Sequence, residues 1–224
     1  MPARDESIDT SDMFIPHNML RDALNRAGVL IGSVTPGDTA RAAVIGSFYD
    51  NVLRFLDAHH GGEDELLYPL ARERRPEHVD VFDRMQGEHE AAASSDASVK
   101  QVLAGWIADP SSDNATALVQ ALGELQTVLG AHLVDEEGTF LPIAASTFTI
   151  EEWSALPGHV ARTFTGDKLW LILGLVFEQM TDEQREMTLA HMPPPLVEMW
   201  NGPGTANFAA FIADVRGTHD AAPA

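Results

Sequence analysis

Two eleven-residue stretches of the chain decide its fold. They read His59-His60-Gly61-Gly62-Glu63-Asp64-Glu65-Leu66-Leu67-Tyr68-Pro69 and His132-Leu133-Val134-Asp135-Glu136-Glu137-Gly138-Thr139-Phe140-Leu141-Pro142. Each has a histidine, a glutamate four residues later, a following acid, and then a Tyr-Pro or Leu-Pro pair. A lone histidine stands upstream of each stretch at nearly the same distance, His17 in the first half and His89 in the second. The chain therefore contains an internal duplication with two imidazoles and one carboxylate in each half.

Both stretches lie in a region of strong helical periodicity. Apolar residues recur there at i, i+3 and i+4, whereas runs of β-branched residues and Asn-Gly hairpin turns are nearly absent. The pattern predicts four long helices, starting near Pro16, after the N-cap residue Asp38, at Pro76, and after the break at 109–113. They end near residues 31, 74, 109 and 142. Long helices joined by short connections favour an all-α, up-down-up-down four-helix bundle.

The remaining sequence divides into an N-terminal arm and a C-terminal extension. We expect residues 1–11 to be disordered or loosely docked, residues 12–142 to form the bundle, and residues 143–224 to pack on it as a helical extension. Capping-box patterns at 149–152 and 181–184 begin two of the expected short helices, at 149–157, 167–180, 182–191 and 205–215. The extension carries several large aromatic residues, which argue against a free tail: Trp153, Trp170, Phe177, Trp200, Phe208 and Phe211. Only its last residues, 218–224, are expected to be disordered.

Composition excludes several classes of site and partner. The chain has 224 residues, 45% of them hydrophobic, and a formal net charge of −20. It contains no cysteine, so disulfides, zinc-thiolate sites and iron–sulfur clusters are excluded, and any metal must have nitrogen and oxygen ligands. Such an acidic surface repels nucleic acid and anionic lipid, so we discount both as partners. The acidic N-terminus has no signal-peptide pattern and the longest apolar run has nine residues, so we expect a cytoplasmic protein with no membrane span.

The duplicated residues are spaced as ligands of two metal ions. Residues four apart share one face of a helix, so His59 can act with Glu63, and His132 with Glu136. In an up-down bundle, all four helices can present these groups at one depth. The predicted set is His17 and His59 for one ion and His89 and His132 for the other, with Glu63 and Glu136 bridging the two. Imidazole with carboxylate suits iron, but also zinc, copper or nickel.

With this pattern the chain resembles the hemerythrin-like (HHE cation-binding) family over residues 12–142. The family motif H…HxxxE…H…HxxxE is matched at six positions: His17, His59, Glu63, His89, His132 and Glu136. The resemblance implies two iron ions in an oxo- or hydroxo-bridged centre that binds or reduces oxygen, nitric oxide or peroxide. Ferritin-like bundles differ, since they use Glu-x-x-His and mostly carboxylate ligands.

The chain departs from the oxygen-carrying hemerythrins on the third helix. Those proteins have HxxxH there and HxxxxD on the fourth helix, whereas Met85 and Ala93 stand four residues either side of His89. A missing fifth histidine leaves more exchangeable positions on the metals. This favours turnover of peroxide or nitric oxide over reversible oxygen carriage.

Three local ambiguities remain in the sequence. His60 with Asp64 is a shifted alternative to His59 with Glu63; the two histidines lie about 100° apart around a helix, so both cannot easily face one ion. Glu137 is the corresponding alternative to Glu136. The third ambiguity is the pair of glycines at 61–62. Each glycine costs about 1 kcal/mol in a helix interior relative to alanine, so the pair indicates either a kink or room beside the metals.

Three functions fit these features. The first is redox handling of peroxide, nitric oxide or oxygen by a di-iron protein, and the second is non-enzymatic oxygen or iron sensing, binding or storage. The third is a helical interaction module with vestigial histidines. The other histidines, His78, His159, His191 and His219, have no matched partner and are interpreted as surface or extension residues.

Overall fold

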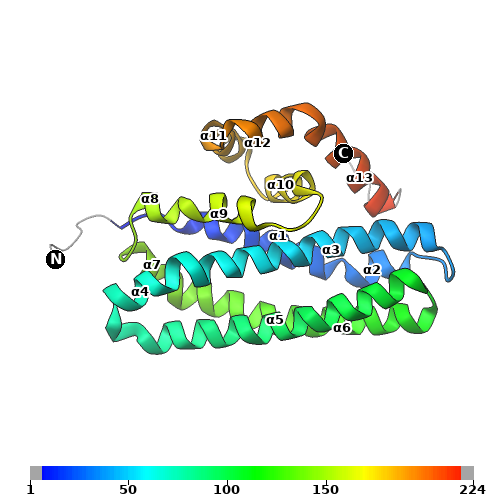
Figure 1. Cartoon of the computed structure of the whole chain (residues 1–224), viewed down its shortest axis with the longest axis horizontal. Helices are drawn as coiled ribbons and strands as arrows, with labels where there is room; N and C mark the ends of the chain where they lie inside the picture. Colours follow the sequence, from blue (N-terminus) through cyan, green and yellow to red (C-terminus); the bar gives the residue numbers. More distant parts are fainter. Residues whose placement is uncertain (1–6, 218–224) are drawn as a thin grey trace.

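Four helical rods form the core of the molecule. The computed structural model describes residues 7–217, and within this range the chain forms helices and no β-strand. The rods are η1 (Ser11–Met13), α1 (Phe14–Asn25) and α2 (Ala27–Gly32); α3 (Thr39–Gly62), η2 (Glu63–Leu67) and α4 (Tyr68–Arg74); η3 (Pro76–His78) and α5 (Val79–Ala108); and α6 (Ser112–Asp135), η4 (Glu136–Phe140) and α7 (Leu141–Ala145). They alternate in direction along the chain (Figure 1), which confirms the predicted all-α bundle.

The helix starts follow from the local sequence. The Asp38 carboxylate accepts a hydrogen bond from the Arg41 backbone N–H at 2.9 Å and caps α3. Ser111 caps α6 in the same way through the Asn114 N–H. The second rod ends at Arg74, as predicted, and Pro76 opens the next turn, since proline fits the first turn of a helix.

The interior contains two apolar clusters, one near each end of the bundle. The larger cluster includes Leu20, Leu56, Val99 and Leu129, and the smaller one includes Met13, Leu67, Met85 and Phe140. Each rod contributes to both clusters. A layer of the bundle therefore lies between them, at the same depth on all four rods.

The C-terminal extension is also helical and covers one side of the bundle. Its elements are α8 (Ile150–Trp153), α9 (Ala155–Thr163), α10 (Leu169–Glu178), α11 (Asp182–His191), α12 (Pro194–Met199), η5 (Trp200–Gly204) and α13 (Thr205–Arg216). Both predicted capping boxes are present, at Thr149 with Glu152 and at Thr181 with Gln184. Helix α12 was not predicted; it begins inside the proline cluster because proline is tolerated in the first helical turn.

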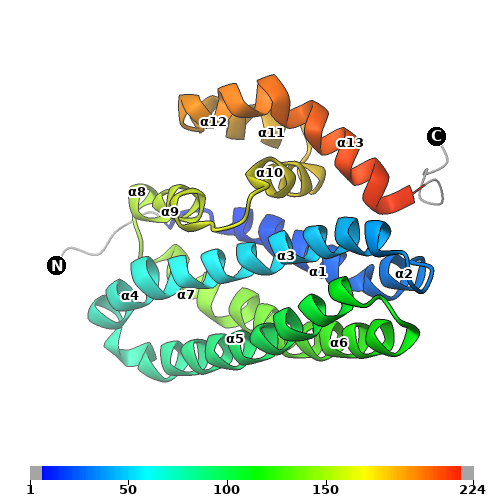
Figure 2. The same ribbon diagram turned by 45° about the vertical axis from the view of Figure 1, so that its right-hand side comes forward.

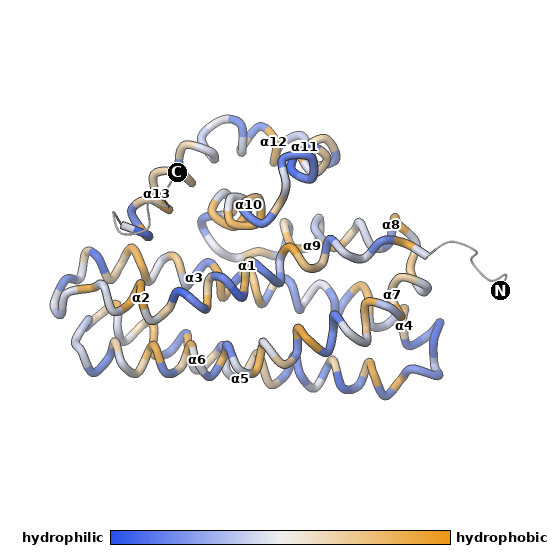
Figure 3. Tube along the Cα trace, turned by 180° about the vertical axis from the view of Figure 1, so that it is seen from behind, coloured by the Kyte–Doolittle hydropathy of each residue, from blue (hydrophilic) through white to orange (hydrophobic). Residues whose placement is uncertain are grey.

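Helix α10 joins the extension to the bundle. It is strongly apolar and lies between the bundle and helices α11 and α12 (Figures 2 and 3). Helix α13 also contacts the bundle directly, since Ile212 and Val215 belong to the larger apolar cluster. Leu171, Ile172 and Leu175 are buried in the larger apolar cluster. Gly174 allows close packing of α13, because a Cβ there would lie 2.2 Å from the Phe208 ring. Burial of this surface explains why the extension is folded.

Helix α6 and its continuation, Ser112–Ala145, form one uninterrupted helical rod. By length and composition alone this helix could also cross a membrane. Within residues 7–217 it is the one helix of which this is true. In the fold its buried residues pack inside the bundle, among them Leu118, Leu122 and Leu125. A core helix accounts for its hydropathy.

The N-terminal arm is described from residue 7 onward. The Ile8 backbone N–H donates to the Ala145 carbonyl at 2.9 Å, and the Trp153 indole N–H donates to Asp12 at 2.9 Å. The arm is therefore held at the junction between bundle and extension over these residues. The expectations for residues 1–6 and for 218–224, including His219, lie outside the described range.

Candidate metal centre

Both HxxxE segments change from α-helix to π-helix at the glutamate. Glu63 and Glu136 are the first residues of η2 and η4, and in each the carbonyl of the glutamate accepts a hydrogen bond from the residue five positions later. A proline follows directly, Pro69 or Pro142. Proline lacks an N–H and its ring clashes with the carbonyl four residues back, so the wider π-turn accommodates it. The Tyr-Pro and Leu-Pro endings of the repeats therefore shape the backbone beside the glutamates.

The six predicted ligand residues lie together in the layer between the two apolar clusters. All are buried, with exposed fractions between 0 and 3%: His17, His59, Glu63, His89, His132 and Glu136. They come from all four rods, as the duplication predicts. A buried charged or polar layer requires internal partners or a metal ion to compensate for lost hydration.

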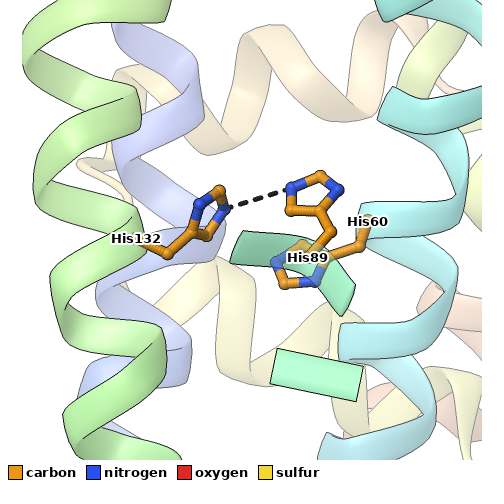
Figure 4. A group of neighbouring side chains, drawn as sticks. All are labelled: His60, His89 and His132. Carbon is orange, nitrogen blue, oxygen red and sulfur yellow. Dashed lines mark hydrogen bonds between the residues drawn. The ribbon is translucent and has the colours of Figure 1, made fainter. Parts of the chain in front are cut away.

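Two groups of side chains have the geometry of metal sites. In the first, ligand atoms of His17, His59 and Glu63 all lie within 4.8 Å of one another. In the second, the same holds for His60, His89 and His132, whose imidazoles approach one another from three rods (Figure 4). The structure thus brings His17 close to His59, and His89 close to His132.

His59 and His60 are both close to the candidate ligands. The sequence interpretation makes His60 an alternative to His59, because neighbouring helix positions do not easily face one ion. The two residues instead face different groups. The His60 ring stacks on the His89 ring with centroids 4.0 Å apart, and His60 is 7% exposed. Helix α3 therefore brings a fifth histidine into the two groups.

The two glutamates lie between the groups. One oxygen of Glu63 is 3.4 Å from His59 Nε2, and the other is 3.5 Å from His89 Nε2. Oε2 of Glu136 is 3.3 Å from His17 Nε2 and 3.5 Å from His132 Nε2. Each carboxylate thus reaches both groups, which is the arrangement that bridging ligands require.

Glu137 and Asp64 lie outside this inner layer. Glu137 contacts the outer nitrogen of His17, Nδ1, at 2.8 Å, and Asp64 contacts Nδ1 of His89 at 2.9 Å. The structure thus places Glu136 toward the centre and Glu137 behind it. Glu88, which sequence reasoning missed, contacts Nδ1 of His132 at 3.0 Å. Its sequence signal was its position directly before His89.

Gly61 and Gly62 differ in their surroundings. The backbone remains helical at Gly62, so no kink forms there. A Cβ at Gly62 would lie 2.6 Å from Leu156 and 3.2 Å from the His159 ring, whereas a Cβ at Gly61 would meet nothing within 4 Å. The space at Gly62 is therefore occupied by helix α9, beside the candidate ligands.

The inner polar atoms are suited to a cation. Among the described residues, no hydrogen-bond partner is present for Nε2 of His17, His59 and His60 or for either carboxylate oxygen of Glu63 and Glu136. Nε2 of His89 and Nε2 of His132 lie 3.2 Å apart, so in the metal-free protein they can share a hydrogen bond when one of them carries the hydrogen (Figure 4). Such buried groups are costly unless they are compensated. Divalent cations within the two groups would satisfy these atoms together, so the residues fit a two-metal centre.

Burial sets the protonation of the histidines. It lowers the pKa of His59 to about 3 and that of His132 to about 4, and it holds the pKa of His60 well below the usual range. Burial also opposes the charge of His17, but the neighbouring carboxylates of Glu136 and Glu137 outweigh it and raise the pKa. Neutral imidazole is the form that binds metals, so three of the five are poised for ligation.

The two glutamates form a coupled buried pair. Burial and the nearby charge of Glu136 raise the pKa of Glu63 well above the ordinary range. Burial opposes the charge of Glu136 too, but the adjacent imidazole of His17 prevails and lowers its pKa. Two carboxylates this close share a proton unless cations compensate for both charges.

Comparison with known proteins identifies the bundle. The family model described as the hemerythrin HHE cation binding domain matches residues 10–144. Since this is more than half of the chain, the chain belongs to that family. No curated protein and no solved structure matches the chain.

Proposed function

We propose that this member of the hemerythrin HHE family holds a non-haem di-iron centre that reacts with oxygen, peroxide or nitric oxide. The observation that carries the proposal is the pair of ligand groups joined by Glu63 and Glu136. Five imidazoles and two carboxylates form a nitrogen-rich set that suits iron. When bound, iron would supply one-electron redox chemistry and exchangeable positions for small molecules.

The histidine count makes the two positions unequal. Three imidazoles, from His60, His89 and His132, surround one position, whereas only His17 and His59 face the other. We expected a more open site from the sequence, because His60 was not counted. Small molecules would therefore exchange on the His17–His59 side, where fewer protein ligands are present.

The surrounding residues hold and shield the centre. Phe55 stacks on His59 with ring centroids 5.8 Å apart, and the two apolar clusters close the layer above and below. The Tyr68 hydroxyl lies 3.4 Å from His89 Nε2 and is the nearest phenol to the centre in the described contacts. Exclusion of bulk water strengthens electrostatic interactions in such a site.

Metal analysis and rapid kinetics test this function. Protein produced with ample iron should contain two iron atoms per chain and show the absorption of a bridged ferric pair. Stopped-flow spectroscopy of the reduced protein should show turnover with peroxide or nitric oxide. A protein that binds no iron would refute the di-iron proposal. A stable, reversible oxygen adduct with no turnover would refute the redox function and leave the centre intact.

A second candidate function is oxygen or iron sensing, in which the state of the centre changes the packing of the extension. One observation favours it: Leu156 and His159 of α9 pack against Gly62. In sequence Gly62 lies directly before Glu63 and two residues after His60. His159 also lies 3.8 Å from Glu65. If sensing is the function, hydrogen exchange in α9 should differ between reduced and oxidised protein. Identical exchange in the two states would exclude it.

A further inference from the structure

Three carboxylates outside the inner layer each contact the outer nitrogen of a histidine. The pairs are Asp64 with His89 at 2.9 Å, Glu88 with His132 at 3.0 Å and Glu137 with His17 at 2.8 Å. In sequence, acids such as Asp64 and Glu137 resemble parts of a solvated acidic face. In the structure they are paired with the buried layer, and they are absent from the two ligand groups.

The three pairs follow one rule around the bundle. Each carboxylate is adjacent in sequence to a candidate ligand and contacts the histidine of the next rod along the ring. Asp64 links the rod of α3 to α5, Glu88 links α5 to α6, and Glu137 links the rod of α6 to α1. A repeated arrangement of this kind is not expected from a randomly charged surface.

The chemistry of the pairs fixes the orientation of the rings. An ionised carboxylate only accepts hydrogen bonds, so the Nδ1 of each paired histidine must carry the hydrogen and donate it. In the neutral ring this leaves the lone pair on Nε2. That atom faces the inner layer in all three residues, where it lies 3.3–3.5 Å from Glu63 or Glu136. Outer hydrogen bonds of this kind orient metal-binding histidines and raise their basicity.

We propose that Asp64, Glu88 and Glu137 are positioning residues that hold His89, His132 and His17 in the metal-binding tautomer and orientation. The inference rests on the proposed metal centre and extends it to residues outside the family motif. It also divides the five histidines into three that a carboxylate holds at Nδ1 and two, His59 and His60, for which the described residues include no such contact at Nδ1.

The three carboxylates should differ in how strongly they hold their histidines. The side chains of Asp64 and Glu88 are 42% and 30% exposed, whereas that of Glu137 is 15% exposed. Glu137 alone is fixed by a guanidinium, since Arg21 donates to its Oε1 at 2.8 Å. Solvent screens exposed pairs more than buried ones, so Glu137 should contribute most and Asp64 least.

Alanine and amide variants test this role with Zn²⁺ as a diamagnetic probe. In competition with a chelator, Glu137→Ala should bind Zn²⁺ about 10- to 100-fold more weakly than wild type, followed by Glu88→Ala and then Asp64→Ala. Glu137→Gln should recover part of the loss, because its amide oxygen still accepts from His17. Glu90→Ala is the matched control: it removes an exposed acid on the other side of His89.

A nuclear magnetic resonance measurement separates positioning from general destabilisation. In Glu137→Ala, the Nδ1–H of His17 should exchange faster with solvent, while those of His89 and His132 stay unchanged. If the three alanine variants bind Zn²⁺ as tightly as Glu90→Ala, the positioning role is wrong and the metal centre stands. If wild type binds neither Zn²⁺ nor iron, the metal centre and the positioning role are both overturned.

Discussion

Replacing His60 by alanine removes one imidazole from the group that also contains His89 and His132. The side chain is 7% exposed, it stacks on His89, and its Nε2 has no hydrogen-bond partner among the described residues. We expect His60→Ala to weaken metal binding at this position while leaving the His17–His59 position intact. The variant therefore tests whether His60 is a metal ligand or a core residue.

The effect on the metal-free protein should be small. Truncating the ring leaves a cavity, which costs about 2–3 kcal/mol of unfolding free energy in a well-packed core. It also removes a buried, unpartnered nitrogen, whose burial costs about 1–3 kcal/mol. These contributions oppose each other, so the metal-free variant should lie within about 2 kcal/mol of wild type.

The effect on the metal-loaded protein should be larger. Ligand at 100 times its dissociation constant stabilises the folded state by about 2.7 kcal/mol. After a 100-fold loss of affinity at one position, only about 0.4 kcal/mol of that stabilisation remains, so about 2.3 kcal/mol is lost. For a chain of this length, 1 kcal/mol shifts Tm by about 2–4 °C, so the metal-induced rise in Tm should shrink by about 5–9 °C.

Thermal unfolding with and without metal, together with metal content after challenge with a chelator, provides the assay. His60→Ala should retain one tightly bound ion where wild type retains two. His78→Ala is the control, because His78 lies in η3 outside both ligand groups. If His60→Ala retains two ions and the full metal-induced rise in Tm, His60 is a core residue, and the assignment of three histidines to one ion is wrong.

Two further predictions concern stability. Burial and the nearby carboxylate of Asp57 raise the pKa of Asp96 to about 6, despite the contact of Asp96 with Lys100. The folded state therefore holds this proton more tightly than the unfolded state does. Between about pH 4 and 6, metal-free wild type should therefore lose about 1–2 kcal/mol relative to Asp96→Asn as pH rises, measured by urea unfolding; parallel curves would contradict this. Gly61→Leu should raise stability by about 0.5–1 kcal/mol through helix propensity, whereas Gly62→Leu should lower it by about 1–3 kcal/mol and increase proteolysis of α9, because only its side chain meets Leu156 and His159. Equal effects at the two glycines would show that α9 does not depend on this contact.

Patterns of short range were readable from the sequence. Capping residues such as Asp38 act within one helical turn, so the helix starts were predictable. The pairing of His59 with Glu63 and of His132 with Glu136 follows from helix geometry alone. The duplication then implied that His17 and His89 complete the set, since a bundle with equivalent halves brings matched positions to one depth.

The assignment of His60 depended on distances between helices. Its angle on α3 was known from the sequence, but the positions of α5 and α6 relative to that angle were not. Two neighbouring residues can face two adjacent groups, and only the packed bundle shows that this happens. The close approach of α9 at Gly62 was hidden for the same reason, because the extension has no periodic relation to the bundle.

The sequence by itself thus determined a duplicated helical bundle with six inward-facing histidines and glutamates, because these features follow from periodicity within single helices. Only the tertiary structure decided that His60 joins them and that Asp64, Glu88 and Glu137 stand behind three of the histidines. Those contacts cross between rods. Their partners are set by how the apolar clusters pack the rods together, which no local spacing encodes.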